Sequence, residues 1–564
     1  MGNGIYSIVT HNKMVQAFRK TFSGVQNRRI ESIGAAALII AFSGILSRIL
    51  GFLRDRMLAG TFGAGDALDA YYAAFRIPDL FYGLLIAGAL SAAFVPLFTE
   101  LQEEGRPLES WKLTRGLLQV IALTLGTLSF VGILFAPYIV NFLVPGFEEG
   151  QKEVTVTLTR IMLISPVFLG LSAVFGGVLV SLKRFVVYSL APVFYNIGII
   201  LGIYFLVPTY GIYGVAWGVV VGALLHMLVQ YPAFLSSGFV PARETFFFWQ
   251  DKHLRSVITL MIPRSLSMGI TQFSLFIVTI FASTLSAGSL AAFNFANNIQ
   301  SVPLGIFGVA FSLAVFPVLS VFAAKKKHED FFYSVINTSK RILFFVIPVS
   351  IAMILFRAQF VRIILGSGAF DWEDTIMTFE ILQYFALSLF AQCLIPLFAR
   401  SFFALKNTKT PLYIALFSEV IHIISLVLLL PYFEERALAI SFSIGTIINF
   451  VLLYLALRKQ SVVWKDKEFF WPVGKMLLAA IIAGTVAQVS KSIFALTTNE
   501  LDTFAEVFLQ LMAGLLIGGG VYFAVAALLR IEELALVHKL IFQKLLRRPS
   551  VLAQVKDSPE RGDW

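Results

Sequence analysis

The chain has 564 residues, of which 58% are hydrophobic and 14% are charged, and its mean hydropathy is +0.83. Soluble domains carry about 25% charged residues, so this composition excludes a soluble globular protein and predicts an all-α protein that crosses the membrane several times. The net charge of +11 could indicate a nucleic-acid partner, but cytoplasmic loops of membrane proteins collect Lys and Arg. We therefore expect contact with membrane lipids and no nucleic acid.

Residues 1–32 are polar and basic, and they lack the apolar core and cleavage site of a signal peptide. After residue 32, apolar runs of about 20 residues or more recur, and each is long enough to span a bilayer. We predict about fourteen spanning helices, over residues 33–60, 67–98, 113–137, 154–181, 185–207, 211–236, 256–283, 289–323, 332–356, 375–404, 410–432, 437–457, 470–490 and 503–529.

Lys and Arg gather in alternate loops between these helices, which sets the expected orientation. The basic segments "LKR" (Leu182–Arg184) and "KKKHED" (Lys325–Asp330) fall on the side of the N-terminal tail, whereas the acidic "EEGQKE" (Glu148–Glu153) falls on the opposite side. Basic loops stay in the cytoplasm, so we expect both termini to be cytoplasmic.

A weak internal repeat suggests two related halves. "ALSAAFVP" (Ala89–Pro96) resembles "AFSLAVFP" (Ala310–Pro317), and the two segments lie six predicted helices apart. Parallel repeats of this kind flank a central site in many transporters. We predict a basic tail at 1–32, an N-lobe of six helices at 33–240, a C-lobe of six helices at 241–460, two further helices at 461–530 and an amphipathic cytoplasmic tail at 531–564.

The stretch "SRILGFLRDRMLAG" (Ser47–Gly60) places Arg48, Arg54 and Asp55 inside the first predicted helix, and Asp69 and Arg76 follow in the second. Charge in hydrocarbon costs at least a few kcal/mol per residue, and such residues usually face the interior of a bundle or an aqueous cavity. They could pair with each other to hold two helices together. Alternatively, the excess of Arg could bind an anion, since the planar guanidinium suits phosphate.

These residues resemble a known family. "SRILGFLRDRMLAGTFGAGDALDAYYAAFRIPDLF" with the following "GALSAAFVPLF" (Ser47–Phe98) looks like the signature of the MurJ/MviN lipid II flippases, which belong to the MOP exporter superfamily. Three further segments carry the same resemblance, namely Phe135–Phe147, Phe281–Ser320 and Lys406–Ala415. It implies two six-helix lobes around a central cavity, and two extra helices forming a groove for a lipid tail.

The resemblance also implies a substrate and its binding residues. The substrate would be undecaprenyl diphosphate carrying a disaccharide-pentapeptide, which is lipid II. Arg48, Arg54, Asp55 and Asp69 stand at the family's essential arginines and acids, and Arg76 stands at a position that is usually basic. We expect Arg48 and Arg54 to meet the diphosphate and Asp55 to orient an arginine.

The sequence also departs from the family pattern. Many members have a basic residue where Tyr82 or Gly83 stands, and an Asp-Arg pair where Asn297 and Asn298 stand. Arg76 and Arg264 are the candidates to replace the missing arginines, and both asparagines can still donate hydrogen bonds.

A sodium site known in some members is not expected here, because its acid is replaced by Val278 and its Asn by His422. Glu419 and His422 could couple protons, or they could simply form a polar pair between helices. The one cysteine, Cys393, and the six scattered His residues show no spacing typical of a metal site.

We thus predict a flippase of the bacterial cytoplasmic membrane that moves lipid II from the inner to the outer leaflet by alternating access. We expect a monomer. We also expect no cofactor, since the sequence contains no nucleotide-binding G-x-x-x-x-G-K-[ST] loop. A flippase for another polyprenyl-diphosphate-linked oligosaccharide stays open as the alternative. An enzyme acting on such lipids is disfavoured, because no constellation of acid, base or metal ligands is readable.

Overall fold

The computed structural model describes residues 33–85, 89–239, 251–461, 464, 466–497 and 503–534. Within these residues all regular secondary structure is helical, as the sequence predicts. The predicted tail at 1–32 lies outside the described residues, as does most of the amphipathic segment after residue 531.

The described residues fall into two compact units. The N-terminal unit contains the chain up to Phe295 together with Ile364–Thr378 and Leu429–Leu438, and the C-terminal unit contains the other residues. The lobe boundaries predicted from sequence stay predictions.

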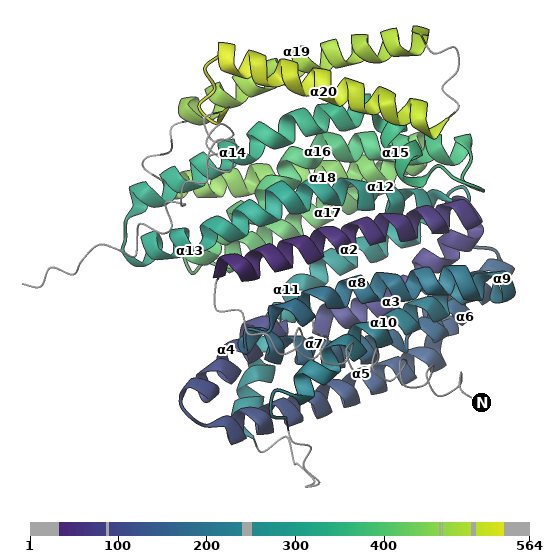
Figure 1. Cartoon of the computed structure of the whole chain (residues 1–564), viewed down its shortest axis with the longest axis vertical. Helices are drawn as coiled ribbons and strands as arrows, with labels where there is room; N and C mark the ends of the chain where they lie inside the picture. The colour runs from purple at the N-terminus through teal and green to yellow at the C-terminus, as the bar shows by residue number, and fades with distance from the viewer. Residues whose placement is uncertain are drawn as a thin grey trace, which may run out of the picture. The chain divides into compact units, whose positions relative to one another are not determined.

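In the described part of the chain, ten α-helices precede residue 285 (Figure 1). They are α2 (Ile33–Phe62), α3 (Asp66–Leu85), α4 (Ala89–Glu103), α5 (Pro107–Leu143), α6 (Glu149–Met162), α7 (Ser165–Ser181), α8 (Phe185–Leu201), α9 (Val207–Tyr210), α10 (Ile212–Leu235) and α11 (Lys252–Ala282).

Nine more α-helices follow. They are α12 (Ser289–Pro303), α13 (Ala310–Ala324), α14 (His328–Leu355), α15 (Arg357–Leu365), α16 (Trp372–Ala404), α17 (Lys409–Phe433), α18 (Glu435–Gln460), α19 (Asp466–Thr497) and α20 (Phe504–Leu528). Both members of the internal repeat open a helix, since α4 begins at Ala89 and α13 begins at Ala310.

Helices cover all fourteen predicted ranges, and in the described part of the chain eleven of them are long and apolar enough to cross a membrane. The predicted count of fourteen spans and the cytoplasmic position of both termini stay predictions.

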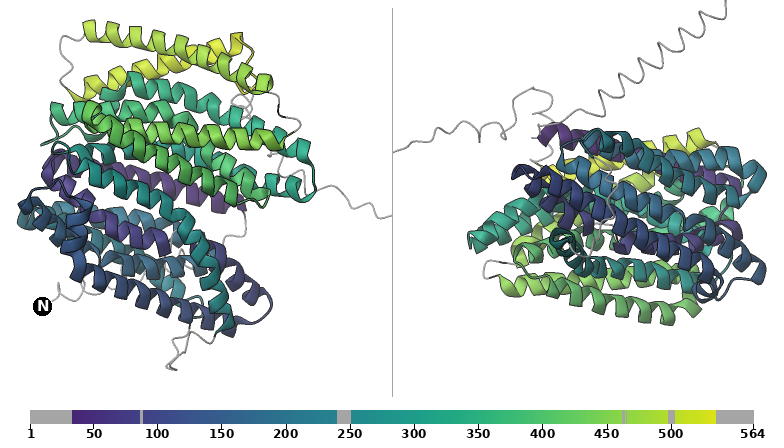
Figure 2. Two further views of the ribbon diagram at one scale, coloured as in Figure 1. Left: turned by 180° about the vertical axis from the view of Figure 1, so that it is seen from behind. Right: turned by 90° about the horizontal axis from the view of Figure 1, so that it is seen from below.

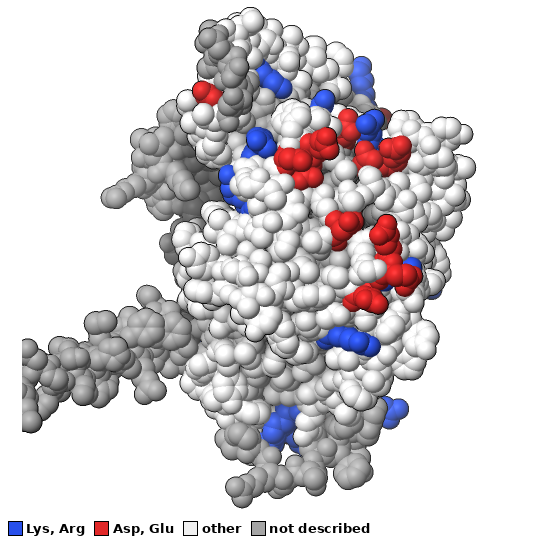
Figure 3. Space-filling view, turned by 90° about the vertical axis from the view of Figure 1, so that its right-hand side faces the viewer, with Lys and Arg blue, Asp and Glu red and all other residues white. Residues whose placement is uncertain are grey.

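Figure 3 shows one face of the molecule on which acidic side chains gather. Acidic residues stand in the first turns of α3, α6 and α16, and the Gln151 side chain of α6 donates to the carbonyl oxygen of Asp66 in α3 at 3.1 Å.

Helices α8 and α10 approach each other closely within the N-terminal unit. A Cβ atom added at Gly198 would overlap the Cα atom of Gly222, and one at Gly202, in the π-helical segment Gly202–Leu206 that continues α8, would overlap that of Gly218. Small residues at such spacing let membrane helices pack backbone to backbone. This contact fixes α8, which carries Asn196 toward α2.

In the C-terminal unit, α19 and α20 lie side by side and pack against α14 (Figures 1 and 2). The Tyr522 hydroxyl of α20 donates to the carbonyl oxygen of Phe344 in α14 at 2.7 Å. Beyond the end of α14, the Gln359 side chain donates to that of Gln510 in α20, also at 2.7 Å. Buried polar groups rarely lack partners, so these bonds fix how α20 packs against α14 and α15.

Candidate substrate-binding site

Arg54 on α2 is held by two partners within the N-terminal unit. Its Nε and Nη2 atoms both donate to Oδ1 of Asp55, at 2.9 and 2.7 Å, and its Nη1 atom donates to Oδ1 of Asn196 on α8 at 3.2 Å. Asn196 in turn donates to the hydroxyl of Ser47 at 3.2 Å, which ties α8 back to α2. Asp55 thus contacts an arginine, and its predicted part in orienting that arginine for the substrate stays a prediction.

The same guanidinium keeps donors for a ligand. Arginine has five N–H groups, and three of those of Arg54 are used in these bonds, which leaves two without a partner among the described residues. The Arg54 side chain is 22% exposed, whereas that of Asp55 is only 4% exposed. The pair therefore presents a fixed and partly accessible cation, which is what binding of a phosphate requires.

Arg76 on α3 is buried and meets two neutral acceptors. Its Nε atom donates to the hydroxyl of Thr279 on α11 at 3.0 Å, and its Nη2 atom donates to Oδ1 of Asn294 on α12 at 2.7 Å. It makes no ion pair with a described carboxylate, but Asp79 interacts with it electrostatically and offsets part of its buried charge. An anionic ligand would add to that compensation.

Arg54 and Arg76 face a common region of the unit. Tyr72 interacts electrostatically with Asp55, Arg54 and Arg76, and Asp79 interacts with both arginines. The Tyr72 hydroxyl is buried there, and it finds no hydrogen-bond partner in the described part of the chain. It is a further potential donor, and it interacts electrostatically with both arginines.

Asp69 accepts hydrogen bonds from backbone N–H groups, whereas Asp55 accepts them from an arginine. Its Oδ2 atom accepts from the backbone N–H of Gly288 and its Oδ1 atom from that of Ala291, both at 2.8 Å. These groups belong to the first turn of α12, where free N–H groups attract a carboxylate. In this conformation Asp69 caps a helix, and its predicted part in substrate binding stays a prediction.

The structure places the other predicted residues as follows. Arg48 is exposed on α2 and lines a cavity of the N-terminal unit. Asn297 and Asn298 are half-buried in the C-terminal unit, where the Gln392 side chain donates to Gln300, and Gln300 donates to Asn297. Arg264 belongs to α11, in a stretch whose side chains lie outside the described residues.

Glu419 and His422 lie together on α17, with Nδ1 of His422 3.0 Å from Oε1 of Glu419. His422 is buried, and both residues lie on α17, so they form a polar pair within one helix and not the pair between helices that the sequence suggested. Their coupling role stays a prediction. Among the described residues there is no group of His, Cys, Asp and Glu that could hold a metal ion.

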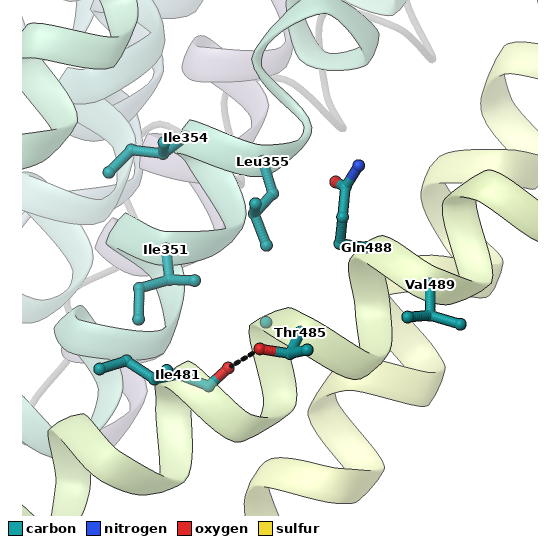
Figure 4. A pocket seen from close by; sticks show the side chains of 8 residues that line it. Ile351, Ile354, Leu355, Ile481, Thr485, Gln488 and Val489 are labelled. Atoms are coloured by element: carbon teal, nitrogen blue, oxygen red, sulfur yellow. Dashed lines mark hydrogen bonds between the residues drawn. The ribbon is translucent and has the colours of Figure 1, made fainter.

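The C-terminal unit contains two apolar cavities bounded by α14 and α19. Figure 4 shows the larger, of about 430 Å³, with Ile351, Ile354 and Leu355 of α14 facing Ile481 and neighbouring residues of α19. Its other lining residues are Gly484, Thr485, Gln488 and Val489. A neighbouring cavity of about 220 Å³ extends the apolar surface to α20. Together they offer space for a hydrocarbon chain.

Comparison with known proteins decides the family. The sequence model of the family described as "Lipid II flippase MurJ" matches residues 58–510 of the chain. The chain belongs to the MurJ family. The resemblance carried by the stretch from Ser47 to Phe98 is thereby confirmed.

Individual relatives agree with this membership in the MurJ family. The "Lipid II flippase MurJ" of Burkholderia cenocepacia is 31% identical over 438 residues, which cover 76% of this chain and 84% of the relative. The "Probable lipid II flippase MurJ" of Bdellovibrio bacteriovorus is 27% identical, covering 92% of this chain and 98% of the relative.

Solved structures confirm the fold of this MurJ family member. "Lipid II flippase MurJ, inward closed conformation" matches with a TM-score of 0.71 at 25% identity, over 91% of this chain and 100% of that chain. An inward-facing MATE family transporter of the MOP superfamily matches with a TM-score of 0.59 at 16% identity, over 73% of this chain and 94% of that chain. The predicted MOP fold and the location as a multi-pass protein of the bacterial inner membrane are confirmed.

Three contacts of the site were not predicted from the sequence, namely Asn196, Thr279 and Asn294. Asn196 interrupts the apolar run "FVVYSLAPVFYNIGIIL", and a polar residue at membrane depth was the available signal. Thr279 carries no such signal, because a threonine can satisfy its hydroxyl within its own helix, as Thr279 does on the carbonyl oxygen of Leu275.

Proposed function

We propose that this protein flips lipid II from the inner to the outer leaflet of the cytoplasmic membrane by alternating access. The observation that carries the proposal is Arg54, a cation fixed by Asp55 and Asn196 that keeps two N–H donors and partial exposure. In a MurJ family fold, the ligand that fits such a cation is the diphosphate of the lipid.

The remaining polar groups would complete the binding of the diphosphate. Arg48 supplies a second accessible guanidinium on α2, and buried Arg76 supplies positive charge toward the same region as Arg54. The Tyr72 hydroxyl adds a neutral donor. Arg76 and the Tyr72 hydroxyl would compensate for the basic residue that many family members have where Tyr82 or Gly83 stands, and for the arginine of the Asp-Arg pair that they have where Asn297 and Asn298 stand.

The apolar cavities bounded by α14, α19 and α20 support the binding of the prenyl tail. Burial of each CH₂ group from water is worth about 0.8 kcal/mol, but a tail moving from bilayer to groove stays in an apolar medium. These cavities therefore position the tail but add little binding free energy, and the polar headgroup determines which lipid is moved.

The lipid undergoes no covalent change in this cycle, so we propose a transporter that is not an enzyme and needs no cofactor. We further propose that it acts as a monomer. Glu419 and His422 stay the candidate residues for coupling to an ion.

Complementation tests the proposal. Arg48→Ala, Arg54→Ala and Asp55→Ala should each fail to support growth of cells depleted of their own lipid II flippase, while the protein still inserts into the membrane. Normal growth with Arg54→Ala would contradict the proposed diphosphate contact. Binding of the purified protein to lipid II, compared with other polyprenyl diphosphates, separates the proposed cargo from the alternative one.

A further inference from the structure

The N-terminal unit contains a cavity of about 550 Å³, in which Arg48 is the one proposed diphosphate contact. It is lined by residues of α2, α3, α4, α7, α8 and α10, and Arg48 is the one charged residue among them, apart from any charge on His226. Pockets that bind small ligands have volumes of about 300–1,000 Å³. The cavity is therefore large enough for part of a substrate.

A network of three side chains forms one wall of this cavity. The Gln230 amide donates through Nε2 to the hydroxyl of Ser172 at 2.6 Å, and that hydroxyl lies 2.7 Å from Nδ1 of His226. Ser172 and Gln230 are almost completely buried, with 0% and 1% of their surface exposed. The network fixes the orientation of the Gln230 amide, because Nε2 also donates to the carbonyl oxygen of His226 at 3.3 Å.

This orientation leaves the Oε1 atom of Gln230 buried without a hydrogen-bond donor in the described part of the chain. An added Cβ at Gly176 would lie 3.1 Å from this atom and 3.0 Å from Cδ2 of Tyr188, so Gly176 and Tyr188 border the acceptor closely. A buried acceptor without a donor costs about 1–3 kcal/mol. A native fold retains such a group where a ligand or a water supplies the donor.

The lining indicates which ligand fits. No acidic residue lines the cavity, so a cation is not favoured, and the polar groups other than Arg48 are mostly hydroxyls and amides. Elsewhere in the lining the hydroxyl of Ser189 donates to that of Ser43 at 3.0 Å, and Tyr82 and Tyr188 contribute two more hydroxyl groups. Neutral donors and acceptors in this mixture match a group rich in hydroxyls and amides.

We propose that this cavity binds the saccharide of the lipid-linked cargo, with Gln230 accepting a hydrogen bond from a sugar hydroxyl or amide. Arg48 lines the same cavity, so a phosphate bound to Arg48 would place the attached sugar within it. This inference rests on the proposed function and adds a determinant of headgroup specificity to it.

Two variants of the full-length protein test the inference. Gln230→Met keeps the length of the side chain and removes the acceptor. Gly176→Ala keeps every hydrogen bond of the network and covers that acceptor, and alanine is at least as good a helix former as glycine. Each should weaken binding of lipid II about tenfold, as expected for one lost hydrogen bond in a buried site, and leave binding of undecaprenyl diphosphate unchanged.

Gln102→Met is the matched control, because Gln102 donates to buried Ser110 at 2.7 Å in the same unit and does not line the cavity. The control should bind both lipids as the unsubstituted protein does. Unchanged lipid II affinity in both variants would show that a structural water alone satisfies Gln230 and would overturn the inference. Equal losses for both lipids would overturn it as well, whereas failure of the unsubstituted protein to bind either lipid would instead refute the proposed function.

Discussion

Arg54 shows how a charged residue inside a membrane protein can be stabilised and still offer hydrogen-bond donors to a ligand. Asp55 neutralises it and Asn196 fixes it, yet two N–H donors stay available. The exposed pair of Arg106 and Glu109 has a similar distance, 2.8 Å between Nη2 and Oε2, but solvent screens it and lets it contribute little. Burial of the carboxylate, more than the distance, distinguishes the two pairs.

Tyr72→Phe tests whether the buried hydroxyl of Tyr72 contributes to binding. The variant should fold at least as stably, because the removed hydroxyl has no partner among the described residues. Its affinity for undecaprenyl diphosphate should fall at least about tenfold, because a hydrogen bond to a charged group is worth about 1.5–3 kcal/mol. Equilibrium binding to the purified protein measures this, with Tyr138→Phe as the control because Tyr138 is 74% exposed. Unchanged affinity of Tyr72→Phe would remove Tyr72 from the site.

Sequence alone predicts the residues of the site better than their contacts. The Arg54–Asp55 pair is readable because the two residues are adjacent and charged within an apolar run. The contact between Arg54 and Asn196 joins two helices far apart in the chain, and no local spacing encodes it. Asp69 is readable as an important acid, but its role as the cap of α12 depends on where residues 288–291 lie in the fold.

At the scale of elements, the close packing of α8 on α10 determines where Asn196 stands. Gly198→Val would place new atoms on the backbone of Gly222 and force the helices apart. Overpacking of this kind costs about 1–3 kcal/mol, so we expect a lower midpoint of thermal unfolding for the purified protein.

The control for this prediction is Gly126→Val in α5, where no atom lies within 4 Å of an added Cβ. That variant should unfold close to the temperature of the unsubstituted protein. Similar losses in both variants would mean that the helix preference of valine, and not the contact of α8 with α10, sets the effect.

Filling the groove between α14 and α19 tests the path of the lipid tail. A Cβ at Gly484 would lie 2.7 Å from Cγ2 of Ile351, so Gly484→Val should narrow the cavity drawn in Figure 4. We expect slower growth in the complementation assay and weaker cross-linking of a photoreactive prenyl tail to α19. Gly474→Val on the same helix has open space around it and should behave normally. Equal labelling in both variants would place the tail elsewhere.

Hydropathy predicted where helices occur but not how they are interrupted. The predicted range 154–181 consists of α6 and α7, which are separated at Leu163–Ile164, just before Ser165 and Pro166. The predicted range 289–323 contains a π-helical segment at Leu304–Val309, directly after Pro303. Proline removes a backbone donor, but whether a helix then bends, widens or stops depends on its neighbours, which the sequence does not specify.

For the whole molecule, the cargo's charge links transport to the membrane potential. Carrying two negative charges outward across about 100 mV, inside negative, yields about 4–5 kcal/mol. Collapse of the potential with an ionophore should therefore slow the appearance of lipid II in the outer leaflet. Collapse of the pH gradient alone serves as the comparison, and an unchanged rate after loss of the potential would argue against this driving force.

Lipid II in the outer leaflet of cells depleted of their own flippase is the most direct measure of the central claim. A membrane-impermeant hydrolase added outside should cleave lipid II when the unsubstituted protein is present, and cleavage should fall more than about tenfold with Arg54→Ala, because a buried carboxylate then loses its partner and the phosphate its donor. Arg106→Ala, which alters only an exposed pair, should retain cleavage. Cleavage with Arg54→Ala equal to that of the unsubstituted protein would contradict the account.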